Sequence, residues 1–198
     1  MAFQAPRSPV QSGNGRSPTA CVKPENSIPE PSRGLGWPEI ESMSKHSRIS
    51  AFVQSLEASS GSDLHPCYAG YFECFNRGDY YEAHDVLEHL WLECRDENHL
   101  YFKGLIQVAG AFVHLKKHYA RPEHPTDGRR LHPASRLLAL GVKNISPFGP
   151  LHMGLNVRAV CELCMDWKER IATFEYLINP WDPAGAPRLQ LEKTQPQA

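Results

Sequence analysis

The sequence of 198 residues lacks long hydrophobic runs and lacks a strong charge of either sign. No segment approaches the roughly 18 apolar residues of a transmembrane helix, and no apolar stretch typical of a secretory signal follows the first methionine. The formal net charge is -1, so charge gives no reason to expect nucleic acid or an anionic membrane as a partner. We therefore expect a cytoplasmic protein that binds neither nucleic acid nor a membrane.

The signatures of several common enzyme classes are absent as well. The sequence contains no P-loop, no dinucleotide-binding glycine pattern and no Gly-x-Ser-x-Gly motif. It has six cysteines, but its one Cys-x-x-Cys pair, Cys161 and Cys164, lies within a helical pattern and has no second pair at zinc-finger spacing. We interpret the cysteines as reduced thiols that pack like small apolar side chains.

Residues 1–62 are punctuated by proline, serine and glycine. Such a composition buries too little apolar surface to offset the entropy of ordering the chain, which predicts a disordered N-terminal tail. Arg7, Arg16 and Lys23 precede the first acidic residue, Glu25. A basic, acid-poor start is also typical of transit peptides, so organelle targeting through this tail is the alternative to a cytoplasmic location.

Residues 63–180 show apolar side chains at helical spacing and no alternation of the kind found in strands. This pattern predicts an all-α domain, a compact bundle of about five helices, followed by a flexible C-terminal tail over residues 181–198. The expected helices are 66–76, 80–94, 100–119, 133–142 and 156–177.

The helix expected at 100–119 is apolar over most of its circumference, which is typical of a central helix. Only a short polar connection, residues 95–98, separates it from the helix before it, so the two are predicted to form an antiparallel hairpin at the centre of the bundle. In that hairpin His84 comes opposite Gly110 and Ala111.

The same hairpin brings ionisable and polar side chains together. His84, Glu88 and Trp91 are four and three residues apart and share one helix face. Glu88 comes opposite the neighbourhood of Gln107, and His114, two turns further along the central helix, comes to the level of Tyr80 and Tyr81. The sequence therefore predicts a buried cluster of these residues on one seam.

Three interpretations of this cluster remain open. It forms a structural hydrogen-bond network that fixes how the helices pack. Alternatively, His84, Glu88 and His114 bind a divalent metal ion, which would permit a metal-dependent hydrolase. In the third, His84 and Glu88 act as a general acid and base beside a small-molecule pocket. Trp91 is a core aromatic residue whose indole could donate a hydrogen bond to Glu88.

The two motifs resemble a known family. Phe75 to Trp91 reads FNRGDYYEAHDVLEHLW, and Phe102 to His114 reads FKGLIQVAGAFVH. This pair, an HxxxExxW motif followed by a GLIQ-type helix that ends in histidine, is similar to the family catalogued as domain of unknown function 309. The resemblance covers about residues 66–178 and implies a small, all-helical domain of bacterial or plastid type. It implies no reaction.

Carried over by motif position, the resemblance points to a small set of residues: His84, Glu88, Trp91, Gly104, Gln107 and His114. Family members turn tightly after that last histidine, whereas this chain has a longer segment from Lys116 to Pro133. Our preferred interpretation is a small-ligand or metal pocket at the cluster. The alternative is a purely structural or protein-interaction module, and aromatic residues on the first and last helices make a homodimer a further expectation.

Overall fold

The computed structural model describes residues 51, 52, 54, 55 and 64–192. Almost all of the predicted disordered tail, residues 1–62, lies outside the described residues, as does the segment 193–198. The chain divides into two units, Met1–Ile40 and Glu41–Ala198, and only the second contains described residues. No helix in this described part is long and apolar enough to cross a membrane.

The predicted all-α class is confirmed. The described part contains five named α-helices, the short 3₁₀ helices η1 and η2, and one pair of two-residue strands. The helices are α2 (Pro66–Asn76), α3 (Tyr80–Glu93), α4 (Asn98–Ala120), α5 (Leu131–Ile145) and α6 (Val157–Thr173). The 3₁₀ helices η1 (Asp127–Arg129) and η2 (Ser146–Phe148) lie before and after α5.

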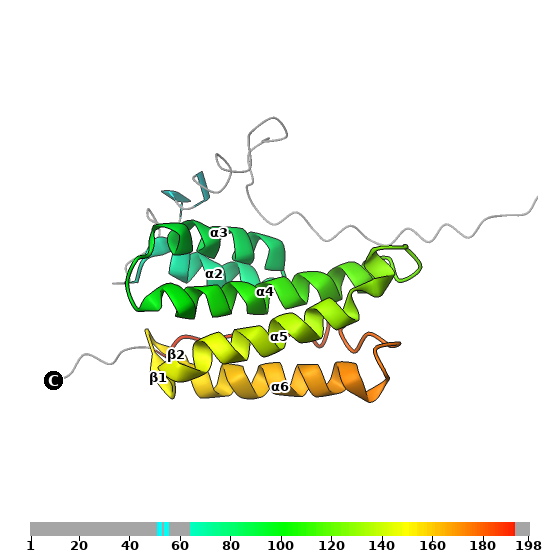
Figure 1. The fold of residues 1–198 in the computed structure, drawn as a ribbon. Coiled ribbons are helices and arrows are strands. Elements are labelled where there is room, and N and C mark those ends of the chain that lie inside the picture. Colours follow the sequence, from blue (N-terminus) through cyan, green and yellow to red (C-terminus); the bar gives the residue numbers. More distant parts are fainter. Residues whose placement is uncertain (1–50, 53, 56–63, 193–198) are drawn as a thin grey trace, which may run out of the picture. The chain divides into compact units, whose positions relative to one another are not determined.

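Helix α4 is the central helix, as its nearly continuous apolar surface predicts. It forms an antiparallel hairpin with α3, and it lies between α2 and α3 on one side and α5 and α6 on the other (Figure 1). The fully buried ring of Phe112 on α4 contacts Phe75 of α2, Tyr80 of α3 and Trp167 of α6, with ring centroids 5.3 to 5.4 Å apart. One aromatic residue thus joins four helices.

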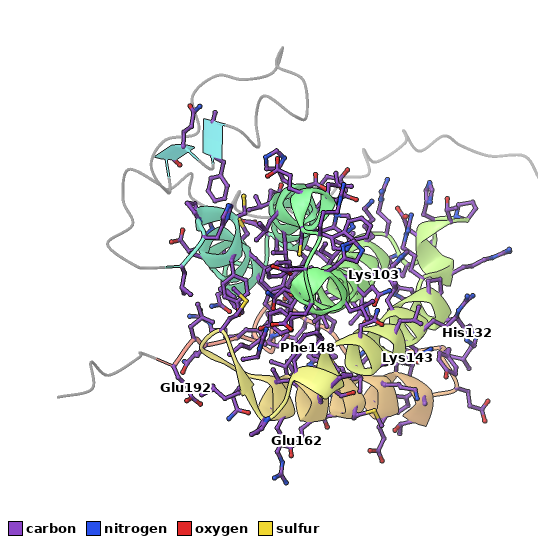
Figure 2. All side chains as sticks on the ribbon, turned by 60° about the vertical axis from the view of Figure 1, so that its left-hand side comes forward. Lys103, His132, Lys143, Phe148, Glu162 and Glu192 are labelled. Atoms are coloured by element: carbon purple, nitrogen blue, oxygen red, sulfur yellow. The ribbon has the colours of Figure 1, made fainter. Side chains whose placement is uncertain are left out.

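Side chains fill the space between the helices, whereas the labelled His132 and Glu162 lie on the outside (Figure 2). Helices α4 and α5 approach each other most closely at Gly104 and Gly141. A methyl group on Gly104 would collide with the side chain of Ile145 and would lie 3.1 Å from the carbonyl oxygen of Gly141. The absence of a side chain on Gly104 therefore permits the close approach of α5 to α4.

The sequence shows no alternation of the kind found in strands, and Gly154 lies between two of the expected helices. The structure places two short antiparallel strands there, β1 (Leu151–His152) and β2 (Leu155–Asn156). Met153 and Gly154 between them have φ angles of 46° and 77°, the left-handed region that tight hairpin turns require. Strands of two residues are too short to show alternation, which is why the pattern missed them.

The predicted flexible tail begins at residue 181, yet residues 181–192 pack against the domain. Trp181 and Leu189 are each only 4 % exposed and belong to the same core as the helices. The side chain of Asn76 donates to the carbonyl oxygen of Leu189 and accepts from its amide, both at 2.7 Å. The packed part of the chain therefore extends beyond the predicted boundary at residue 180.

Candidate functional site

The side chains of His84, Asp85 and Glu88 on α3 form a compact group. Each offers one ligand atom, an imidazole nitrogen or a carboxylate oxygen, and these atoms all lie within 4.8 Å of one another. Asp85 is buried, with 5 % of its surface exposed, whereas the side chains of His84 and Glu88 are partly exposed. A buried carboxylate below two accessible ligand groups is an arrangement that a cation would stabilise.

The imidazole of His84 is oriented by its neighbour in the sequence. Its Nδ1 atom lies 3.2 Å from Oδ1 of Asp85. An ionised carboxylate only accepts hydrogen bonds, so Nδ1 donates the proton, and Nε2 of the neutral ring then carries the lone pair. The ring also lies against α4, because its Cδ2 atom is 3.9 Å from the position of a methyl group built on Gly110. The predicted register, with His84 opposite Gly110, is confirmed.

Asp85 is the member of this group that the sequence pattern missed. Helical spacing from His84 leads to Glu88, four residues on, and then to Trp91, three residues further. It does not pass through Asp85, which directly follows His84. Asp85 is three residues before Glu88, so these two residues also share a helix face. The position of the acidic Asp85 directly before the apolar Val86 and Leu87 is the signal that could have identified it.

Gln107 bonds to a different helix. Its Oε1 atom accepts a hydrogen bond of 2.8 Å from Nδ2 of Asn144, so it connects α4 to α5. The predicted cluster placed Gln107 with Glu88 on the α3 side of the hairpin. The side-chain hydrogen bond that the structure shows for Gln107 is the one with Asn144, which links α4 to α5.

His114 is likewise held by residues outside the hairpin. Its Nδ1 atom lies 3.1 Å from Nη1 of Arg130 at the start of α5, and Nε of Arg130 donates to Oδ1 of the buried Asp127 at 2.6 Å. Arg121 pairs with the other oxygen of Asp127. His114 is not part of the His84 group, so the three ligand groups that lie close together differ from the predicted set of His84, Glu88 and His114.

The surrounding charges affect the protonation of this network. Burial is the main cause that lowers the pKa of His114, and the positive charges of Arg130 and Lys117 add to it. The hydrogen bond from Arg130 and the charge of Arg121 lower the pKa of Asp127. The result is a neutral imidazole beside an ionised carboxylate and two guanidinium groups. A histidine that already accepts from arginine in a positive environment is poorly placed to bind a metal cation.

Trp91 lies at the end of the α3–α4 hairpin. Its ring packs on His99, with centroids 4.9 Å apart and an interplanar angle of 32°. Its indole Nε1 is buried and has no hydrogen-bond partner, so the donation to Glu88 that the sequence suggested does not form. The role of Trp91 is therefore packing at the hairpin end.

The Cys-x-x-Cys pair on α6 does not have the character of a redox or metal site. Cys164 is fully buried, and burial raises its pKa to about 12. Burial also raises the pKa of Cys161. Redox and metal chemistry need the thiolate, and both thiols are held in the protonated form, as expected for a packing role.

These elements define a class of protein, an all-helical bundle whose central hairpin carries a His-Asp-Glu group. Residues 68–122, which run from within α2 to just past the end of α4, match the model of the family described as Domain of unknown function (DUF309), the family that the two motifs predicted. The match contains all five candidate residues and ends before α5. No curated protein and no solved structure matched the chain.

Proposed function

We propose that the domain binds a divalent metal ion through His84, Asp85 and Glu88. The observation that supports this proposal is the mutual approach of their three ligand atoms to within 4.8 Å. In protein sites an ion lies about 2.0–2.2 Å from nitrogen and oxygen ligands, so ligands on opposite sides of it are separated by about 4 Å. The observed separation of at most 4.8 Å is therefore close to the spacing that one shared ion would require.

The chemistry of the three groups indicates which ions would bind. One imidazole and two carboxylates suit Zn²⁺, Mn²⁺ or Fe²⁺. Calcium prefers a shell made of oxygen atoms alone, and copper(I) prefers sulfur ligands, so both fit less well. Three protein ligands also leave coordination positions for water, which a hydrolytic metal site requires. We restrict the proposal to metal binding.

Asp85 has two roles that are consistent with its position. It either binds the ion directly or holds His84 through Nδ1 so that Nε2 faces the ion, the arrangement of carboxylate, histidine and metal seen in many sites. The side chain of His84 is 31 % exposed and that of Asp85 is 6 % exposed. An ion would therefore approach from the side of His84.

A structural role is the second candidate, and the partly buried hydrogen bond between Asp85 and His84 favours it. In that case the group fixes α3 against α4 and binds nothing. Removing His84 would then take one hydrogen-bond partner from the buried Asp85 and lower the free energy of unfolding by about 1–3 kcal/mol, with or without metal.

Metal analysis and unfolding experiments separate the two candidates. The full chain, prepared without a histidine tag, would be incubated with Zn²⁺ or Mn²⁺, desalted and analysed by mass spectrometry, beside His84→Gln and Glu88→Gln. His114→Gln is the matched control, since His114 lies on the same hairpin but outside the group. We expect the wild type and the control to retain close to one ion per chain, and the other two variants to lose it.

Thermal unfolding would be followed in the same samples with metal and with a chelator. A metal at about 100 times its Kd stabilises a folded protein by about 2.7 kcal/mol, so the wild type should melt at a higher temperature with metal than with chelator. The His84→Gln variant should show no such difference. Absence of metal from the wild type, together with equal melting temperatures in both conditions, would reject the proposal and leave the structural role.

A further inference from the structure

A second candidate site lies away from the His84 group, where the end of α2 meets α4 and the C-terminal segment. The structure has a hollow of about 540 Å³ there, and we call it the basic hollow. Asn76, Arg77 and Gly78 line it at the end of α2, and Lys116 lines it from α4. The C-terminal segment provides the remaining wall through Trp181, Pro183, Ala184, Ala186 and Arg188. The volume of the hollow lies in the range of about 300–1,000 Å³ that is typical of small-molecule sites.

The lining of the basic hollow is positively charged. Its lining residues include Arg77, Lys116 and Arg188, and none of them is acidic. Lys116 donates from Nζ to the carbonyl oxygen of Gly78 at 2.8 Å, which keeps its charge beside the hollow without neutralising it. Within the described ranges, Arg188 has no hydrogen-bond or ion-pair partner.

Two acidic residues lie close to the lining residues in the sequence, and both already accept hydrogen bonds. Asp79 pairs with Nε of Arg77 at 3.2 Å, and Nη2 of Arg77 contacts Sγ of Cys74 at 3.6 Å, which leaves Arg77 with further N–H donors on its two terminal nitrogens. Oδ1 of Asp182 accepts from the amides of Ala184 and Gly185, both at 2.8 Å. The hollow therefore has more positive than negative charge along its wall, which favours an anionic ligand.

The wall of the basic hollow is also held in place. The two hydrogen bonds between Asn76 and Leu189 attach the end of the C-terminal segment to α2. At its start, the ring of Trp181 packs on Tyr80 and on Tyr119, with centroids 6.3 and 5.3 Å away. A ligand would find the segment already ordered, so binding would not have to offset the entropy of ordering it.

We propose that the basic hollow binds an oxyanion, a phosphate or a carboxylate, carried by a small molecule with an apolar part. The guanidinium groups of Arg77 and Arg188 supply paired N–H donors that match the geometry of both anions. Trp181 and the small apolar residues at 183–186 provide the surface for the apolar part of the ligand. This site is independent of the proposed metal site.

Four probes at equal ionic strength test the proposal by isothermal titration calorimetry on the full chain. They are phenyl phosphate, benzoate, inorganic phosphate and benzyl alcohol. We expect saturable binding of phenyl phosphate or benzoate, the tighter of the two identifying the anion, and weaker binding of inorganic phosphate and benzyl alcohol. No saturable binding of either aromatic anion up to about 10 mM would overturn the proposal.

Variants connect the binding to the hollow. Arg188→Gln should weaken binding of the aromatic anion about tenfold or more, the effect of losing a charged hydrogen-bond donor. Ala184→Glu, at an exposed position of the wall, should weaken it similarly by repulsion. Arg136→Gln is the matched control, because Arg136 is an exposed arginine on α5 outside the hollow. Equal weakening by the control, with circular dichroism unchanged in all variants, would indicate nonspecific attraction and would reject the site.

Discussion

The Nδ1 atom of His114 accepts a hydrogen bond from Arg130, over a distance of 3.1 Å between the nitrogens, because arginine has only donors. The imidazole is neutral at this nitrogen, and its pKa is lowered by burial first and by Arg130 and Lys117 second. A proton on Nδ1 would turn the acceptor into a donor that faces a guanidinium group. The contact therefore exists only while the histidine is unprotonated.

We expect the stability of the domain to fall as the pH is lowered through this range. In the unfolded chain His114 binds a proton near its ordinary pKa of 6.5, whereas the folded protein resists protonation until a lower pH. Stability is therefore complete above the unfolded pKa and is lost as the pH falls from there through the folded pKa. His118, whose pKa is lowered by burial, acts in the same direction.

Urea unfolding at about pH 7.5 and about pH 5.5 measures this effect, since those values lie on either side of the ordinary histidine pKa. His114→Gln keeps an acceptor for Arg130 but does not titrate, so the variant should lose less stability between the two pH values than the wild type. An identical loss in both proteins would contradict the assignment to His114.

Two glycines on α4 should respond in opposite ways to the same substitution. Gly104→Ala should lower the free energy of unfolding by about 1–3 kcal/mol, because the added methyl group collides with Ile145 in the tight contact between α4 and α5. Gly110→Ala is the control. Its methyl group would lie 3.5 Å from Leu137 and 3.9 Å from His84, which are ordinary contacts.

Because alanine favours helix by about 1 kcal/mol over glycine, Gly110→Ala should be neutral or stabilising. Urea unfolding of both variants provides the comparison. If Gly104→Ala proved as stable as Gly110→Ala, the close approach of α4 and α5 would not describe the protein in solution.

The sequence was sufficient to predict contacts that depend on helix periodicity and a short connection. The α3–α4 hairpin could be predicted because both helices have apolar residues at helical spacing. The connection between them is so short that the two helices must be antiparallel. That hairpin alone determines that His84 lies opposite Gly110. The match of residues 68–122 to the family model was predictable from the two motifs, most of whose residues lie on this hairpin.

Contacts made by other segments could not be predicted in this way. Arg130, the partner of His114, follows a loop that is rich in proline. The sequence of this loop has no periodic apolar pattern from which its path could be predicted. Asn144, the partner of Gln107, lies at the end of α5, beyond the predicted end of that helix at residue 142. The position of α5 depends on Gly104 and Gly141, whose importance appears only when the two helices are placed together.

The hydrogen bond between Gln107 and Asn144 should contribute to the attachment of α5. We expect Gln107→Ala and Asn144→Ala each to lower the free energy of unfolding, with a coupling of about 0.5–1.5 kcal/mol in the double-mutant cycle. The coupling is measured by urea unfolding of the wild type, both single variants and the double variant. Strictly additive effects would show that the bond of 2.8 Å contributes nothing to stability.

Residues 181–192 should be essential for stability because they bury Trp181 in the core. Trp181→Ala removes a ring that is 4 % exposed and whose Nε1 donates to the hydroxyl of Tyr80 at 3.4 Å, and we expect a loss of about 3–5 kcal/mol. Leu177→Ala is the control, since Leu177 is 77 % exposed, and it should change stability by no more than about 0.5 kcal/mol.

Truncation provides the complementary measurement. A chain that ends at residue 180 should be destabilised at least as much as Trp181→Ala, because it also loses Leu189 and both hydrogen bonds to Asn76. A chain that ends at residue 192 keeps all of these contacts and should unfold at the same urea concentration as the full chain. Equal midpoints for the chains ending at 180 and 192 would restore the sequence-based prediction of a loose tail from residue 181 onward.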